Sequence, residues 1–261
     1  MVPLVIGAIL LLPTPVLALV LALIIAGGLW EWSRMVPLYT GMARLVFLLA
    51  GMALAGLIWW ITPAVAITPL LLVALLWWLF VLFWLAHPEI TAPLSSRIIT
   101  LKVVGGYLAL LPAWAALVVL HARTQDGPLI TLYLLVVVWL ADSGAYFAGR
   151  RWGSRKLAPV ISPGKTWEGV YGAVASSGIF ALAAGLLYSQ SIQWTASLVV
   201  ITMVTVMFSI AGDLLESLMK RQCGIKDSGH IIPGHGGILD RIDSLTAAAP
   251  VFLLGLHWMQ L

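Results

Sequence analysis

Apolar residues in this chain run in long stretches, broken by short clusters of proline, glycine and charge. About 20 apolar residues cross a bilayer, whose core offers no partner for free backbone groups, so these runs predict transmembrane helices. The pattern predicts an all-α, polytopic membrane bundle of about nine spans: Val2–Leu12, Val16–Trp32, Ala43–Ile61, Thr68–Ala86, Ile98–Leu120, Leu129–Gly149, Trp167–Tyr188, Trp194–Arg221 and Leu239–Trp258.

The first predicted span is short. Pro13 and Pro15 interrupt the opening apolar stretch, which indicates a tight hairpin there. The piece before the break is about 16 Å long, against a hydrocarbon core of about 30 Å. We expect a half-span, the alternative being that residues are missing upstream. A cleaved signal peptide is not expected, because a basic n-region and a small-residue cleavage site are absent.

Composition agrees with a membrane protein, since 62% of residues are hydrophobic and 9% are charged. A soluble domain carries about 25% charged residues, so a soluble enzyme is excluded. The single cysteine, Cys223, excludes an internal disulfide and a thiolate metal cluster. With these spans, every lysine and arginine except Arg123 falls on one side, which the positive-inside rule assigns to the cytoplasm.

Acidic residues divide the chain in two. Residues 1–128 hold only Glu31, Glu89 and Asp126, all near span ends, and the remaining acids lie in residues 129–261. We therefore expect an N-terminal membrane scaffold, 1–128, that shapes a lipid cleft and forms a dimer. The second part, 129–261, is expected to be a catalytic membrane domain whose site faces the cytoplasm.

The eighth span carries a polar stripe. Asp213 lies about 28 Å along it from Trp194, at the inner membrane edge, and Glu216, Ser217 and Lys220 follow on the same helical face. A solvated helix end would explain this stripe. The alternative is a functional site, because polar residues that begin within a membrane must face protein or a water-filled cavity.

The segment that follows, residues 220–243, combines cations, carboxylates and glycines. Gly234, Gly236 and Gly237 would let backbone N–H groups converge on an anion. Asp240 and Asp243 share one face at the start of the ninth span, and carboxylates without thiolates suit a hard cation such as Mg²⁺. This combination predicts phosphoryl chemistry. His230 and His235 have unsuitable spacing for zinc, which leaves a phosphate contact or a structural hydrogen bond.

A second polar region is expected on the same side, from Asp142 to residue 169. Its Gly164-Lys165-Thr166 triplet resembles a P-loop, but position 159 is proline and we expect no preceding strand, so that interpretation fails. Lys165 and Thr166 open the seventh span and would hold a phosphate at a helix N-terminus. Ser162 is equally well explained as a helix cap, and the basic run at 150–156 as membrane anchoring.

Three segments together resemble the phosphatidate cytidylyltransferase (CDP-diacylglycerol synthase) family in its bacterial form. The longest, Ser217 to Asp243, reads S-x-x-K-R-x-x-x-x-K-D-S-G-x-x-x-P-G-H-G-G-x-x-D-R-x-D, and the others are Asp142–Tyr146 and residues 156–169. The resemblance is close over 139–250 and rests on hydropathy alone in the first half. The departure is the start, where family members usually have a basic residue and a full first span.

The resemblance implies transfer of a cytidylyl group from CTP to phosphatidate, giving CDP-diacylglycerol and pyrophosphate for phospholipid biosynthesis. It further implies Mg²⁺, a homodimer and the bacterial cytoplasmic (inner) membrane, with no nucleic-acid partner; a second, monovalent cation is left open. The residues expected to act are Asp213 and Asp240 as metal ligands; Lys220, Arg221, Lys226, Asp227 and Asp243 in catalysis; and Asp142, Ser162, Lys165, Thr166, Ser217, Ser228, His235, Gly236, Gly237 and Arg241 in substrate binding.

Two alternatives stay open on the sequence. Another CTP-dependent membrane enzyme, a CDP-archaeol synthase or a polyprenol kinase, would share the metal and the nucleotide but use a different lipid. An ion-coupled transporter with Asp142 and Asp213 as carriers would require inverted repeats and charges at the midplane. Here the acids cluster toward one face of the membrane instead.

Overall fold

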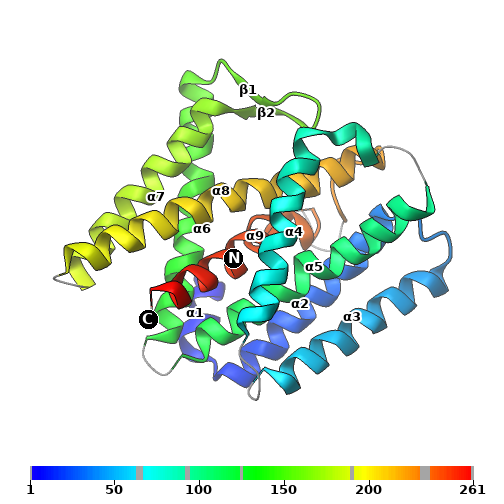
Figure 1. Cartoon of the computed structure of the whole chain (residues 1–261), viewed down its shortest axis with the longest axis horizontal. Coiled ribbons are helices and arrows are strands. Elements are labelled where there is room, and N and C mark those ends of the chain that lie inside the picture. The colour runs from blue at the N-terminus through cyan, green and yellow to red at the C-terminus, as the bar shows by residue number, and fades with distance from the viewer. Residues whose placement is uncertain are drawn as a thin grey trace.

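The computed structural model of the chain describes residues 2–62, 67–91, 95–123, 126–188, 191–229 and 236–259. Helices make up nearly all of this structure (Figure 1). The elements are α1 (Val2–Leu11), α2 (Thr14–Met35), α3 (Gly41–Ile61), α4 (Thr68–Ala86), the 3-10 helix η1 (Pro88–Thr91), α5 (Ser96–His121), α6 (Gly127–Trp152), β1 (Lys156–Ala158), β2 (Ser162–Thr166), α7 (Trp167–Tyr188), α8 (Ile192–Gln222) and α9 (Leu239–Trp258).

The α-helices coincide with the predicted spans to within a few residues at each end. Seven of them, α2 to α8, are long and apolar enough to cross a membrane. The 10-residue α1 is too short, as the early proline break predicts, and α9 has 20 residues but charged groups in its first turns. The expectation of a polytopic helical membrane protein is confirmed.

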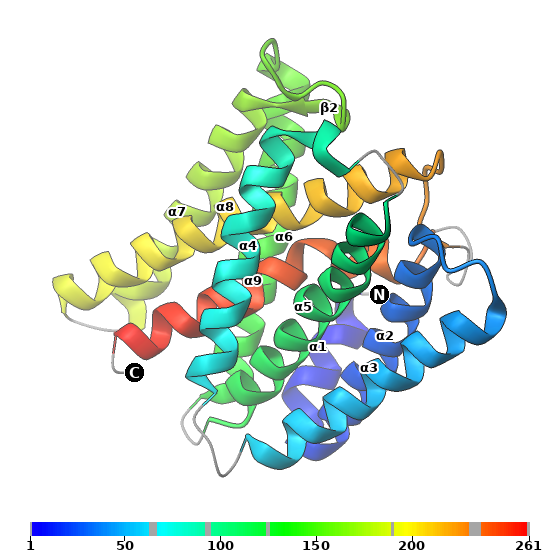
Figure 2. The same ribbon diagram turned by 45° about the vertical axis from the view of Figure 1, so that its right-hand side comes forward.

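Helix α9 is the central element of the bundle. It contacts α2, α4, α5, α6 and α8, and Figure 2 shows it crossing the middle of the molecule. Ala247, Ala248 and Leu253 on α9 are fully buried. A helix surrounded by other helices does not need the apolar surface of a lipid-facing span. The core around it draws on both halves of the chain, and the division into scaffold and catalytic parts stays a prediction.

Helices α6 and α7 pack closely and are joined by the hairpin of β1 and β2 (Figure 1). A Cβ atom at Gly144 would lie 2.6 Å from the carbonyl oxygen of Gly172, so the two backbones can approach only because both positions are glycine. The expectation that no strand precedes the Gly-Lys-Thr triplet is wrong, since β1 does. The triplet itself lies in extended β2, so no P-loop forms.

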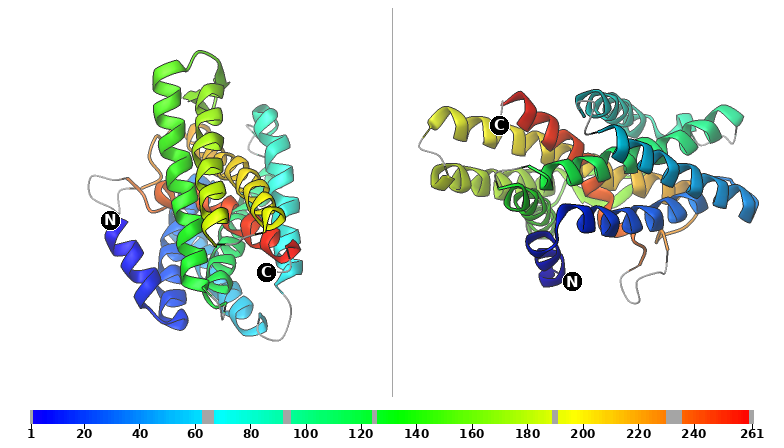
Figure 3. Two further views of the ribbon diagram at one scale, coloured as in Figure 1. Left: turned by 90° about the vertical axis from the view of Figure 1, so that its left-hand side faces the viewer. Right: turned by 90° about the horizontal axis from the view of Figure 1, so that it is seen from below.

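The α1–α2 junction is held by a buried histidine. Pro13 has no N–H, so the carbonyl of Ile9 lacks its helical partner. The Nε2 atom of His121 on α5 lies 2.8 Å from that carbonyl oxygen, and its Nδ1 lies 2.9 Å from the Thr14 hydroxyl. This pairing fixes α1 at the edge of the bundle, where Figure 3 shows it.

Candidate active site

A cavity of about 440 Å³ opens between α6, α7, α8, α9 and the hairpin. Its apolar wall comes from helix residues such as Ala141 and Ile210. Its polar lining gathers residues that are distant in sequence but predicted to share one side of the membrane: Asp142, Tyr146, Arg150, Lys165, Thr166, Asp213 and Ser244. Four predicted site residues, Asp142, Lys165, Thr166 and Asp213, therefore meet in one cavity.

The central feature of the cavity is an ion pair between the hairpin and α8. Lys165 Nζ lies 2.5 Å from Asp213 Oδ2, and the two side chains are 26% and 31% exposed. Ser217 Oγ, one turn further on, donates to Asp213 Oδ1 at 3.3 Å. Thr166 accepts a hydrogen bond from the backbone N–H of Gly169, so Thr166 caps α7. The helix cap that was one alternative for Ser162 is thus made by Thr166, at the other end of β2.

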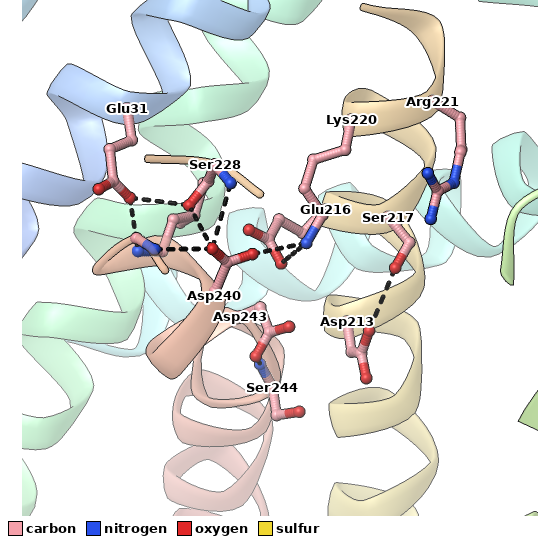
Figure 4. A network of polar contacts seen from close by, with 12 residues as sticks. Glu31, Asp213, Glu216, Ser217, Lys220, Arg221, Ser228, Asp240, Asp243 and Ser244 are labelled. Atoms are coloured by element: carbon pink, nitrogen blue, oxygen red, sulfur yellow. Dashed lines mark hydrogen bonds and ion pairs between the residues drawn. The ribbon is translucent and has the colours of Figure 1, made fainter. Parts of the chain in front are cut away.

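A second cluster, the Glu31 network, joins α2, α8 and α9 (Figure 4). We define it as Glu31, Glu216, Lys220, Ser228 and Asp240. Lys220 Nζ lies 2.6 Å from Asp240 Oδ1 and 3.0 Å from Glu216 Oε2. The three side chains are almost buried, with exposed fractions of 11%, 10% and 3%. These ion pairs are much less exposed than the one in the cavity.

The other carboxylate oxygen of Asp240 accepts hydrogen bonds from Ser228 and Gly237, in the glycine-rich segment. Asp240 Oδ2 accepts from the N–H of Gly237 at 2.8 Å and from the N–H and hydroxyl of Ser228 at 3.1 and 3.0 Å. Gly236 has a positive φ of 79°, and a Cβ there would lie 2.9 Å from the same oxygen. The N–H of Gly237, which we expected to bind phosphate, therefore binds a carboxylate of the protein itself.

Glu31, on α2, is a site-associated residue that the sequence analysis missed. Its carboxylate accepts from Ile238 N at 3.0 Å, Leu239 N at 2.8 Å and Ser228 Oγ at 2.9 Å. The contacts span up to 208 positions in sequence, so no local motif reports them. The available signal is an acid between Trp30 and Trp32 at the end of a predicted span, which the sequence alone does not distinguish from the other acids near span ends.

The remaining predicted residues are more dispersed. Arg221 donates from Nε to the carbonyl of Ile161 at 3.4 Å, on the far side of α8 from Asp240 (Figure 4). Asp243 lies near the carboxylates of both Asp213, in the cavity, and Glu216, in the Glu31 network, and their like charges repel it. Ser162 lies in β2 outside the cavity lining, while Lys226, Asp227 and Arg241 are exposed. His230 and His235, like Gly234, fall outside the described residues.

The carboxylates of the site fit a divalent cation that is bound together with substrate phosphates. Among the described residues, no group of three or more His, Cys, Asp or Glu side chains is arranged to hold a metal ion by itself. Yet Asp213, Glu216 and Asp240 share two lysines as ion-pair partners, Asp243 has none among the described residues, and Glu216 Oε1 is buried without a hydrogen-bond donor there. Such a charge balance suits Mg²⁺, which proteins often bind with one or two carboxylates plus substrate phosphates.

A membrane bundle with a polar cavity that holds the Lys165–Asp213 pair and Arg150, at the predicted cytoplasmic ends of its helices, has the features of a membrane enzyme for anionic substrates. The chain belongs to the cytidylyltransferase family, whose model matches residues 1–259. It is therefore a nucleotidyltransferase, and the resemblance that its motifs indicate is confirmed.

Three relatives illustrate the similarity. A phosphatidate cytidylyltransferase of Pseudomonas aeruginosa is 42% identical over 251 residues, covering 96% of this chain and 91% of that protein. One of Haemophilus influenzae is 36% identical over 254 residues, covering 90% and 88%. One of Staphylococcus saprophyticus is 46% identical over 133 residues, about half of each chain. The similarity to the first two extends along nearly the whole chain.

Proposed function

We propose that this protein transfers the cytidylyl group of CTP to phosphatidate, forming CDP-diacylglycerol and pyrophosphate with Mg²⁺. The observation that carries the proposal is the Lys165–Asp213 pair in a cavity of a cytidylyltransferase-family membrane protein. The name of the two relatives, phosphatidate cytidylyltransferase, supports phosphatidate as the lipid. Asp213 comes late in α8, which supports a cavity at the depth where a lipid headgroup would meet a soluble nucleotide.

The chemistry needs little beyond positioning and charge neutralisation. A phosphatidate oxygen forms a bond to the α-phosphorus of CTP, while the bond from that phosphorus to the bridging oxygen breaks and pyrophosphate leaves. The phosphate monoester is already largely ionised at neutral pH, its second pKa being about 6, so no dedicated base is needed. Lys165 and Arg150 line the cavity and would neutralise charge on the triphosphate, and Lys220 would do so from beside it.

Asp213 and Asp240 are the residues that would hold Mg²⁺, with Glu216 and Asp243 next to them. Bound there, the ion would neutralise charge on the phosphates as the transfer proceeds. In the structure each of these two aspartates has a lysine ammonium as its cation partner. These lysines would be free to contact substrate phosphates once a divalent ion takes over the carboxylates.

We place the site on the cytoplasmic side of the bacterial inner membrane and expect a homodimer. The orientation rests on the distribution of lysine and arginine and on the location of CTP. Helix α3 is the least covered of the long helices, since only 17% of its most apolar stretch is buried. It therefore offers a face to lipid or to a second copy.

The test uses CTP labelled at two positions, with phosphatidate and Mg²⁺ and the protein in detergent. Label from the α-phosphate is expected in a lipid product, and label from the γ-phosphate in pyrophosphate. Transfer of γ-label to a lipid would instead identify a kinase, and a preference for an archaeal ether lipid would change the substrate. The absence of α-label from any CDP-lipid would overturn the proposal.

A further inference from the structure

Glu31 is a fully buried carboxylate without an ion-pair partner among the residues that the structure describes. Burying a charge in this way is costly unless hydrogen bonds compensate. Glu31 accepts three, from two backbone N–H groups and one hydroxyl. A protein with so few acids has placed one of them in its interior, directed at the start of the helix that bears Asp240 and Asp243.

The N-terminus of α9 has no cap of its own. The capping position is Ile238, whose side chain cannot accept a hydrogen bond. The first N–H groups of a helix need acceptors, and a negative charge here is also stabilised by the positive end of the helix dipole. Glu31 supplies both from another helix, because it accepts from the N–H groups of Ile238 and Leu239.

The packing around Glu31 leaves no spare room. A Cβ atom at Gly237 would lie 2.5 Å from Glu31 Oε2, and one at Gly229 would approach Oε1 even more closely. One turn earlier on α2, Gly27 accommodates the side chain of Ile238. The carboxylate therefore packs against two glycines, both in the segment that connects α8 to α9.

Ser228 connects Glu31 to the site. Its hydroxyl oxygen lies 2.9 Å from Glu31 Oε2 and 3.0 Å from Asp240 Oδ2, and its backbone N–H donates to the same aspartate oxygen. Asp240 in turn pairs with Lys220. A displacement of Glu31 would therefore reach both Asp240 and the first turn of α9.

We propose that Glu31 is a positioning residue: it caps α9 from α2 and thereby sets the location of Asp240 and Asp243 at the site. The inference rests on the proposed function for its catalytic consequence but not for its structural part. Glu31→Gln is the informative variant, because the amide keeps one acceptor oxygen and replaces the other with a donor. Glu89→Gln is the matched control, an exposed acid of the same half of the chain.

The structural part is tested by hydrogen exchange on the full-length protein in detergent, without substrate. Glu31→Gln should increase the exchange rate of backbone amides at 237–241 at least tenfold, while Glu89→Gln should leave it unchanged. Unchanged protection at these amides in Glu31→Gln would overturn the cap. This measurement does not depend on which reaction the enzyme performs.

The catalytic part is tested by turnover against Mg²⁺ concentration, at a temperature well below unfolding of either variant. Glu31→Gln should reduce kcat at least tenfold and raise the Mg²⁺ concentration needed for half-maximal rate, with KM for phosphatidate within about twofold. A Glu31→Gln enzyme with normal kcat and a normal Mg²⁺ requirement would overturn the positioning role. Wild-type protein that forms no CDP-lipid would instead refute the proposed function, with the exchange result still standing.

Discussion

Two lysine–aspartate pairs lie at the site, and their surroundings differ. Lys165 and Asp213 meet in the cavity with side chains 26% and 31% exposed, and Asp213 has one further hydrogen bond. Lys220 and Asp240 are 11% and 10% exposed, and Asp240 accepts three more hydrogen bonds from the Ser228–Gly237 segment. The same pair of residue types is thus open and exchangeable in one location, and closed and fully bonded in the other.

The difference indicates a division of work. An ion pair that water and substrate can reach contributes little to stability, because solvent screens it, but its charges stay available to a ligand. A buried pair is costly to break, since removing one partner leaves a charge without compensation. We therefore expect substitutions in the cavity pair to change turnover alone. Substitutions in the buried pair should change both turnover and stability.

Lys220→Met should have the largest effect, because it leaves Asp240 and Glu216 buried without their cation. We expect the free energy of unfolding to fall by about 3–5 kcal/mol, measured by unfolding in detergent, with activity lost in parallel. The double variant Lys220→Met with Asp240→Asn should recover part of that stability without activity. Equal stability of the wild type and Lys220→Met would show that the buried pair is not structural.

Asp213→Asn should come next, with an effect on rate rather than on stability. Loss of a group that neutralises or holds charge in the reaction typically costs on the order of 10²–10³-fold in rate. We expect such a decrease in CDP-lipid formation, and a change in unfolding free energy within about 1 kcal/mol. Asp126→Asn, at an exposed acid bonded to Tyr188, is the control. Near-normal turnover of Asp213→Asn would remove this residue from the mechanism.

Lys165→Met tests whether the cavity lysine serves the substrate. We expect KM for CTP to rise about tenfold, about 1.4 kcal/mol, because a cation facing the triphosphate is lost. The free energy of unfolding should change by less than about 1 kcal/mol, in contrast to the large decrease expected for Lys220→Met. If both lysine variants lose the same amount of stability, the distinction between the two pairs is wrong.

Thr166→Val should have the smallest effect and separates two interpretations of that residue. Its hydroxyl caps α7, so we expect stability to fall by about 1 kcal/mol with KM for CTP unchanged. Kinetics and thermal unfolding measured on the same preparation provide the check. A raised KM with unchanged stability would instead return Thr166 to the predicted role of substrate ligand.

Hydropathy predicted the helices well because a bilayer permits few alternatives. Each long apolar run must satisfy its backbone internally, so run length and proline breaks set the helix bounds. The hairpin of β1 and β2 was missed for the opposite reason: its strands are short, and Lys156, Pro163 and Gly164 are poor strand formers. The hairpin connects two closely packed helices, a tertiary feature that strand propensity does not report.

The site was predictable where its residues lie near one another in sequence. Asp213, Ser217 and Lys220 share a helical face, and the structure keeps them in contact with site groups. Helical periodicity could not reveal that Glu31 would complete the network from α2, nor that the N–H of Gly237 would bind Asp240 rather than a phosphate. Both depend on tertiary contacts between distant segments.

The hydrogen bond between Glu31 and the N–H of Leu239 has a consequence for the synthesis and assembly of the enzyme. The two residues are 208 positions apart, so α2 enters the membrane long before α9 is synthesised. Until α9 arrives, Glu31 has no N–H groups to bind and Lys220 lacks Asp240. An incomplete chain therefore holds most of the helices but no finished site, and activity begins only when the early and late segments meet.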